Sequence, residues 1–293
     1  MKKSFHDSCL VCESKNIQNF HGYESHDLLQ CKKCGFVFMR KIPTTTELED
    51  YYSIYAYERE KELSNATRVS IENLLNKFEK LRRTNKILDV GCGEGWILEC
   101  AKARGWEVYG TEFSPRAVEI CRKKGIKMYV GVLNADDVEE KDFDVIVSSE
   151  TLEHINNPRE EINNFYQLLR RGGLLYITTP NFNSYLRKLF KARYDIIKYP
   201  EHLSYYTKKT LDKLLTESGF RKIKLLTTGI SLSHYQQSKG GEALLTAGGK
   251  HDDERLRDRI VHSPLLGFLK GLVNQILTYL GIGMTLKAFY IRK

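Results

Sequence analysis

The sequence has little proline, with 6 residues among 293, and no hydrophobic run near the ~20 residues that cross a bilayer. The scarcity of proline, with 41% hydrophobic and 28% charged residues, excludes a collagen-like or proline-rich disordered chain and predicts a globular protein with a sizeable core. No apolar segment follows the N-terminal lysines, so the sequence shows no secretory signal. We therefore expect a cytoplasmic protein.

Acidic residues are outnumbered, because 37 aspartates and glutamates stand against 46 lysines and arginines. The formal charge of +9 favours anionic partners such as phosphorylated metabolites, nucleic acid or an acidic membrane surface, and does not choose among them. The length suits one large domain with an appendage.

Stable disulfides are disfavoured in a reducing compartment, so the seven cysteines need another explanation. Four of them form two C-x-x-C pairs, Cys9/Cys12 and Cys31/Cys34. Two intervening residues let both sulfurs of a pair reach one ion from a tight turn, and a tetrahedral Zn²⁺ needs two such turns. Unligated cysteines or a redox pair would leave this spacing unexplained. The pattern predicts a small zinc ribbon over residues 1–42, in which the metal is structural because four thiolates leave no open position.

Residues 43–85 are predicted to form a helical linker or lid. Apolar residues at spacings of three and four indicate an amphipathic helix: Ile71, Leu74, Leu75, Phe78 and Leu81. A tyrosine cluster precedes this helix, and we interpret it as a packing patch or as part of a lid over a ligand: Tyr51, Tyr52, Tyr55 and Tyr57.

A glycine-rich turn follows a short apolar strand at residues 86–95, Lys-Ile-Leu-Asp-Val-Gly-Cys-Gly-Glu-Gly. Its glycines let the backbone approach a ligand, and the following helix directs free N–H groups at it. Trp96 stands where a dinucleotide fingerprint has its last glycine, which weakens a pyrophosphate-binding interpretation. Glu112, at the end of the next strand, is placed to accept hydrogen bonds from ribose hydroxyls. Turn and acid together predict an adenosine-containing ligand without a diphosphate.

The rest of residues 86–293 alternates strands with helices. We predict strands at 87–90, 107–111, 127–130, 144–148, 174–179, 222–228 and 284–293, and helices at 96–104, 114–124, 158–170 and 210–218. This order is typical of the α/β class and predicts a doubly wound, mostly parallel seven-stranded sheet covered on both faces. Ligands of such sheets bind beyond the carboxyl ends of the strands.

Eight short runs in this region carry a resemblance to a known family. They are Leu88-Asp-Val-Gly-Cys-Gly-Glu-Gly95, Gly110-Thr-Glu-Phe-Ser114, Phe143-Asp-Val-Ile-Val147, Glu150-Thr-Leu-Glu-His154, Leu168-Leu-Arg-Arg-Gly-Gly173, Thr179-Pro-Asn181, Glu201-His202 and Gly219-Phe220. In order and spacing, residues 86–230 resemble the class I S-adenosylmethionine-dependent methyltransferases, a Rossmann-like family.

The resemblance implies that S-adenosylmethionine is the cofactor. It assigns the methionine part to the glycine turn, the ribose to Glu112 and one side of the adenine to Phe113. The implied cofactor-binding residues are Asp89, Gly91, Cys92, Gly93, Gly95, Glu112, Phe113, Leu133 and Ser149. Many members have an acid at the position of Val132, so recognition of the adenine edge here would depend on backbone groups.

The sulfonium methyl is already activated, so the protein has to position the acceptor, exclude water and, for a hydroxyl or carbon acid, remove a proton. His202 and His154 are the candidate catalytic histidines, because imidazole ordinarily titrates near neutrality. Glu150 and Glu201 are further candidates. A purely structural role, in which a histidine begins a helix or binds a loop carbonyl, is the alternative for His154 above all.

Residues 184–200 carry five Lys/Arg and three tyrosines against one aspartate. Cations beside aromatic rings suit a phosphorylated or sugar-bearing acceptor, although a solvated basic helix face has the same composition. An RNA backbone would also suit them, but the charge is spread along the chain and no recognised RNA-binding motif is present.

We therefore expect methyl transfer to a small or medium acceptor, with a sugar-containing or phosphorylated intermediate of surface glycan or secondary metabolism as first choice. One alternative is an RNA or protein methyltransferase that uses the ribbon for docking. The other is a non-catalytic module that only binds the cofactor.

A helical insertion is predicted at about 231–283, between the last two strands. Within it, residues 264–280 form a helix with one broad apolar stripe, opened by the cap and first-turn pair Ser263-Pro264. This helix packs on its own domain, pairs with a second copy in a homodimer, or touches a membrane surface as a peripheral contact.

Overall fold

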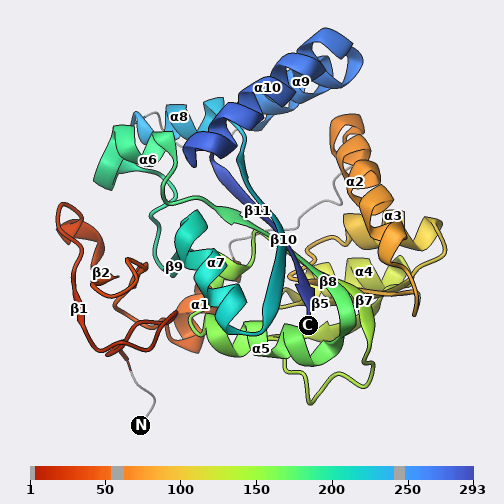
Figure 1. Cartoon of the computed structure of the whole chain (residues 1–293), viewed down its shortest axis with the longest axis horizontal. Coiled ribbons are helices and arrows are strands. Elements are labelled where there is room, and N and C mark those ends of the chain that lie inside the picture. Colours follow the sequence, from red (N-terminus) through yellow and green to blue (C-terminus); the bar gives the residue numbers. More distant parts are fainter. Residues whose placement is uncertain (1–3, 54–62, 241–247) are drawn as a thin grey trace.

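The structure is a computed structural model that describes residues 4–53, 63–240 and 248–293, and its centre is a seven-stranded sheet (Figure 1). The strands are β4 (Lys86–Val90), β5 (Glu107–Glu112), β6 (Lys127–Val130), β7 (Phe143–Ser149), β8 (Leu169–Pro180), β10 (Phe220–Thr228) and β11 (Thr285–Arg292). Their spatial order is β10-β11-β8-β7-β4-β5-β6, with β11 antiparallel to both neighbours and the other pairs parallel. The predicted doubly wound, mostly parallel α/β sheet is confirmed.

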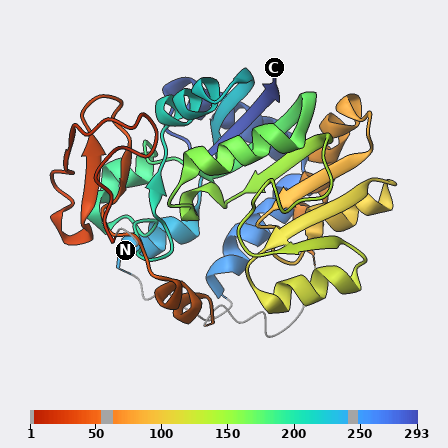
Figure 2. The same ribbon diagram turned by 90° about the horizontal axis from the view of Figure 1, so that it is seen from below.

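The central strands are continuously apolar because helices cover both faces of the sheet (Figure 2). Val145 and Val147 of β7 share one buried cluster with Leu75, while Ile146 between them shares another with Phe165. The helices involved on the two faces are α2 (Asn65–Phe78), α3 (Trp96–Ala103) and α4 (Pro115–Lys123) on the first, and α5 (Pro158–Leu168) and α7 (Lys208–Glu217) on the second. A further helix, α1 (Thr45–Ser53), follows the N-terminal region.

The N-terminal region is a small antiparallel sheet of β1 (Ile17–Asn19), β2 (Leu28–Cys31) and β3 (Val37–Met39). A fourth strand, β9 (Ser204–Tyr205), comes from far along the chain and pairs with β3. Phe36 packs against Tyr206 with ring centroids 5.1 Å apart, and the Arg159 guanidinium donates to the carbonyl of Val11 (2.9 Å). The ribbon is therefore fastened to the larger sheet through β9 and the residue that follows it.

Four helices line the upper edge of the molecule in Figure 1: α6 (Tyr185–Phe190), α8 (Leu232–Ser238), α9 (Gly248–His262) and α10 (Pro264–Leu280). Helix α10 begins as predicted, with the Ser263 side chain accepting from the backbone of Leu266, and ends at Gly281 with φ 68°. Only Leu277 of this helix is buried, so most of its apolar stripe has no partner in the described residues. No single described helix has the length and composition of a membrane span; α9 from Leu256 and α10 pass that test only together, and they are bent by 114°.

Asp144 ties the segment before β4 to the sheet. Its side chain is fully buried, pairs with the Arg170 guanidinium (2.5 Å) and accepts from the backbone N–H groups of Arg83, Thr84 and Asn85 (2.8 Å each). Burial by itself raises the pKa of Asp144, but the hydrogen bonds from Arg170 and from the backbone outweigh it and lower the pKa below its usual range.

We expect Asp144→Asn to lower the free energy of unfolding by about 3 kcal/mol near neutral pH, because it leaves Arg170 without its counter-charge. A carboxyl whose pKa is lowered by folding stabilises the protein above its unfolded pKa of about 4, and this contribution is lost as the pH falls through the folded pKa. Urea unfolding should therefore give a higher free energy of unfolding for wild type than for the variant near neutral pH, and this difference should disappear in acid. Equal stability near neutrality would contradict the assigned role.

Candidate functional site

The glycine turn between β4 and α3 is packed on two sides. Gly91, Gly93 and Gly95 have φ values of 70°, 54° and 73°, which side chains rarely allow. A Cβ on Gly91 would lie 2.6 Å from the Thr151 hydroxyl oxygen, and one on Gly95 would lie 2.9 Å from the Cys121 sulfur. The turn therefore needs glycine for both conformation and space, and its backbone is exposed to whatever ligand lies above it.

Glu112 fastens the middle of this turn to the end of β5. Its Oε2 accepts from the backbone N–H of Gly93 (2.9 Å), and its Oε1 accepts from those of Phe113 and Ser114 (2.8 and 3.0 Å). A carboxylate offers about four acceptor positions, so hydroxyl groups of a ribose can still be bound. The predicted ribose acid thus lies beside the predicted glycine turn.

Two carboxylates at the turn are buried without a hydrogen-bond partner among the described residues. They are Asp89, through its Oδ1, and Glu94, through both oxygens. Burial, with a smaller effect from Glu112, raises the pKa of Asp89 to about 8. Buried acceptors without donors are costly, so the site favours a ligand that brings positive charge and N–H groups. S-adenosylmethionine carries a sulfonium and an ammonium group, and the donor set therefore fits it.

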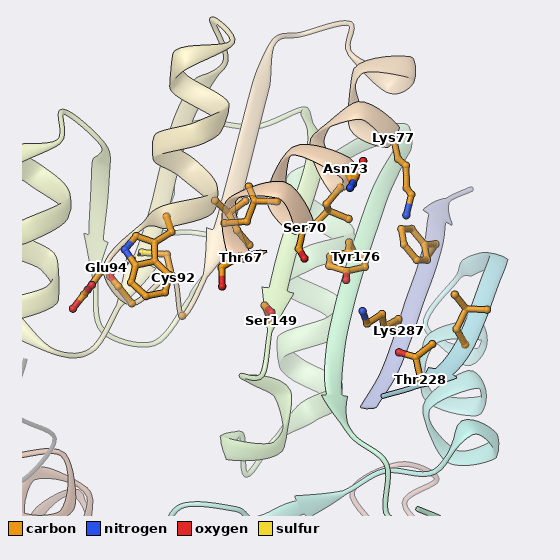
Figure 3. Close-up of a pocket in the computed structure, with 18 of the residues that line it drawn as sticks. Thr67, Ser70, Asn73, Lys77, Cys92, Glu94, Ser149, Tyr176, Thr228 and Lys287 are labelled. Atoms are coloured by element: carbon orange, nitrogen blue, oxygen red, sulfur yellow. Dashed lines mark hydrogen bonds between the residues drawn. The ribbon is translucent and has the colours of Figure 1, made fainter. Parts of the chain in front are cut away.

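A cavity of about 610 Å³ extends from the glycine turn along α2 to β11 (Figure 3). Four of the predicted cofactor residues line it: Gly91, Cys92, Gly93 and Ser149. The remaining polar lining was not predicted as part of the site; it includes Thr67, Ser70, Asn73, Lys77, Glu94, Tyr176, Thr228, Asn274 and Lys287. The α2 residues of the lining could have been grouped from the sequence, since positions 67, 70, 73 and 77 lie on one face of the predicted helix.

Other predicted cofactor residues lie outside this lining. The Leu133 side chain is buried in the core and its carbonyl accepts from the Asn164 amide (2.9 Å), while Val132 is 76% exposed. Phe113 is 40% exposed beside Glu112. Their assignment to the adenine stays a prediction.

Lys287 lines the β11 end of the cavity, and Glu150, which is not part of that lining, is near enough for its charge to act on the pKa of Lys287. Glu150 directly follows Ser149 at the end of β7, has φ 51°, and donates its backbone N–H to the carbonyl of Thr178 (2.9 Å). Desolvation raises its pKa, while the Thr178 hydroxyl and the charge of Lys287 oppose that rise. Burial lowers the pKa of Lys287, and the nearby Lys270 and Lys77 add to this effect. Strained backbone at a strand end beside opposed charges marks a functional position.

The two candidate histidines lie together, with ring centroids 5.0 Å apart, but not in the lining of the large cavity. The Nδ1 atoms of His154 and His202 each lie 2.6 Å from a carbonyl oxygen, so in the neutral rings Nδ1 carries the proton and donates it there. Burial lowers the pKa of both, that of His202 to about 4, so the expected titration near neutrality does not hold for His202. Their nitrogens and a Glu153 oxygen lie within 4.8 Å of one another, a set that could hold a cation.

The lid tyrosines are only partly described. The Tyr51 hydroxyl donates to Glu201 (2.5 Å), the neighbour of His202, so α1 reaches the histidine pair. Tyr55 and Tyr57 lie outside the described residues, and the side chain of Tyr52 is not described.

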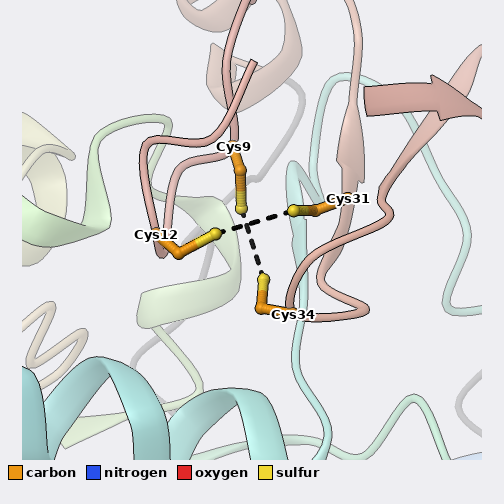
Figure 4. A group of neighbouring side chains, drawn as sticks. All are labelled: Cys9, Cys12, Cys31 and Cys34. Atoms are coloured by element: carbon orange, nitrogen blue, oxygen red, sulfur yellow. Dashed lines mark hydrogen bonds between the residues drawn. The ribbon is translucent and has the colours of Figure 1, made fainter. Parts of the chain in front are cut away.

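The four ribbon cysteines converge on one point (Figure 4). The sulfurs of Cys9 and Cys34 are 3.5 Å apart, those of Cys12 and Cys31 are 3.6 Å apart, and all four lie within 4.8 Å of one another. Tetrahedral Zn²⁺ with bonds of about 2.3 Å sets its sulfurs about 3.8 Å apart, so the donor set and spacing fit one structural zinc.

We expect purified protein to contain about one zinc per chain, and Cys31→Ser to lose it together with thermal stability, because thiolate coordination supplies folding energy. Metal analysis and thermal unfolding measure both effects. Cys100→Ala, which removes a buried thiol outside the ribbon, should keep the zinc. Normal folding without metal would refute the site.

Glu112→Ala should weaken binding of S-adenosylhomocysteine by ~1–3 kcal/mol, the scale of lost hydrogen bonds to a charged group. Isothermal titration calorimetry measures this loss. Glu107→Ala is the matched control, since Glu107 lies on the same strand and is exposed. An unchanged affinity in the Glu112 variant would remove that residue from the ribose role.

Comparisons with known proteins agree with this geometry. Two ubiquinone biosynthesis O-methyltransferases are similar in sequence. That of Azoarcus sp. (strain BH72) is 30% identical over 155 residues, which are 46% of this chain and 66% of the relative. That of Coxiella burnetii (strain RSA 331 / Henzerling II) is 31% identical over 164 residues, 52% of this chain and 68% of the relative. The chain thus spans about two thirds of the length of these relatives.

The fold is shared with a SAM-dependent methyltransferase from Archaeoglobus fulgidus, at a TM-score of 0.51 and 19% identity, over 83% of this chain and 100% of that one. Residues 55–225 match the model of a family described as a methyltransferase domain. Since this match covers more than half of the chain and the strands that build the site, the chain belongs to the class I S-adenosylmethionine-dependent methyltransferases.

Proposed function

We propose that the protein transfers the methyl group of S-adenosylmethionine to a hydroxyl oxygen of a small acceptor bound at the β11 end of the large cavity. The observation that carries this proposal is that one cavity joins the glycine turn to Tyr176, Asn274 and Lys287. The names of the sequence relatives, which are O-methyltransferases, support oxygen as the methylated atom. The predicted sugar or glycan acceptor has no such support.

The bound cofactor supplies an electrophilic methyl group on a sulfonium. Asp89 and Glu94 would counter its positive charge, and the rigid turn would hold it in one orientation. At the other end, the Lys287 ammonium would lower the pKa of an acceptor hydroxyl by stabilising its anion. In this proposal the methyl donor and the acceptor lie at opposite ends of one cavity.

Of the four candidate catalytic residues, His202, His154, Glu150 and Glu201, we favour Glu150 as the group that takes the hydroxyl proton. Its charge acts on both Lys287 and Tyr176 of the cavity lining. A carboxylate with a raised pKa is a stronger base than an ordinary one. His202 lines a separate small cavity together with Glu153, and His154 packs against His202. We assign both histidines a positioning role for the loop that follows Glu150.

Glu150→Gln should reduce kcat by about 100-fold, the lower end of what general base catalysis contributes. Wild-type kcat should rise with pH through the raised pKa of Glu150, and the variant should lack this step. Transfer of a labelled methyl group to a panel of phenols and alcohols measures both, with S-adenosylhomocysteine affinity as the test of an intact fold. His202→Gln is the comparison variant.

If Glu150→Gln has full activity and the same dependence of kcat on pH as wild type, Glu150 is not the general base. If His202→Gln loses that pH dependence instead, His202 is the general base. A protein that binds the cofactor but methylates nothing in the panel favours the macromolecular acceptor or the non-catalytic module.

A further inference from the structure

The helices that lie at the upper edge of Figure 1 carry most of the exposed large apolar side chains of the described residues. Fifteen of the 20 large apolar side chains that are exposed in the described residues lie on α6, α8, α9, α10 or the loop before α8, which we call the α6–α10 face. Phe268 is 64% exposed, Ile276 58% and Tyr279 89%. An exposed patch of this extent marks a surface that is covered by something else.

The helices of this face form one continuous ridge. Phe190 of α6 packs against Tyr235 of α8 with ring centroids 5.5 Å apart. Ser231 and Ser233, at the start of α8, donate to Asp253 of α9 (2.9 and 2.6 Å). Helix α9 in turn contacts α10. The helices that carry the exposed apolar side chains therefore form one connected unit.

Among the side chains that the structure describes, the unpaired charges of this face are all positive. Seven exposed cations have no ion pair among the described residues: Lys188, Lys191, Arg193, Lys239, Arg257, Arg259 and Lys270. The described acids of the ridge form hydrogen bonds within the protein. Asp195 bonds to His234 and Ser238, and Asp253 accepts from Ser231 and Ser233. Asp258 accepts from the backbone N–H of Ala66. The face therefore presents apolar side chains among uncompensated positive charges.

We propose that the α6–α10 face docks on an anionic phospholipid surface, with α10 lying in the plane of the interface. Apolar side chains enter the boundary between headgroups and acyl chains, and lysines and arginines contact the lipid phosphates. A second copy of this chain fits poorly, because pairing the face with itself would bring its unpaired cations together. The charge pattern thus selects a lipid surface as the occupant.

Docking of the α6–α10 face would also bring the lipid surface close to the acceptor end of the cavity. Asn274 of α10 and Lys287 of β11 both line it, and Lys270 and Arg257 are close enough to affect the pKa of Lys287. The cationic face therefore continues into the acceptor end of the cavity. This consequence depends on the proposed function; the docking itself does not.

Vesicle flotation tests the docking. The full-length protein should float with vesicles of phosphatidylcholine and phosphatidylglycerol, much less with phosphatidylcholine alone, and binding should weaken as salt is raised. Phe268→Glu and Ile276→Glu should abolish flotation. Lys188→Glu and Lys191→Glu should each weaken the partition by about fivefold or more, from the contribution of one cation near an anionic surface.

Two matched controls carry the same changes elsewhere. Ile223→Glu alters an apolar side chain on β10 that is 50% exposed, and Lys32→Glu reverses an exposed charge of the ribbon. Both should float like wild type. All variants should bind S-adenosylhomocysteine as wild type does, which shows that they are folded and keeps the outcome separate from that of the methyl-transfer proposal.

The proposal is overturned if wild type stays behind when anionic vesicles float, or if flotation does not depend on the anionic lipid or on salt. It is also overturned if sedimentation shows a dimer that Ile276→Glu converts to a monomer, because the face would then be an interface between copies.

Discussion

The glycine turn after β4 is the constraint on which the site depends. Gly91 fits against Thr151 after β7, Gly95 fits against Cys121 of α4, and Gly93 is bonded to Glu112 of β5. Three neighbouring elements thereby fix one backbone segment before any ligand arrives. The same segment buries Asp89 Oδ1 and both carboxylate oxygens of Glu94 without hydrogen-bond partners in the described part of the chain, a cost that folding alone does not recover. A cationic ligand that satisfies these carboxylates therefore stabilises the folded state by binding to it.

Local patterns in the sequence were sufficient for the parts of the site that are local. Each of these parts is marked by a short pattern of residues. They are the glycine turn, Glu112 at the end of the next strand, the two C-x-x-C pairs and the limits of α10. The predicted order of strands followed from alternation, because parallel strands need crossover helices. The electrostatic effect of Glu150 on Lys287 was not predictable, since it depends on β11 inserting between β8 and β10. Strand β9 was not predicted, because two residues are too few to show the alternation of apolar and polar side chains that marks a strand.

The ribbon and the histidine pair are mechanically connected, although they are far apart in sequence. Strand β3 of the ribbon pairs with β9, and the backbone N–H of Met39 donates to the carbonyl of Leu203 (2.9 Å). Leu203 in turn donates to the carbonyl of Glu153 (2.8 Å), and His154 donates to that of Glu201 (2.6 Å). A zinc bound by the four cysteines would therefore also steady the loop that follows Glu150.

Helix α10 and strand β11 form a second connection, between the exposed face and the cavity. The turn joining them is held by the Asn181 amide, which donates to the carbonyls of Gly281 and Gly283 (3.1 and 2.7 Å). Asn274 lies on the helix side of this turn and Lys287 on the strand side, and both line the cavity. A surface that moves or orders α10 must therefore act on the acceptor end first, while the cofactor end stays fixed by its glycine packing. Occupation of the face should accordingly alter acceptor binding more than cofactor binding.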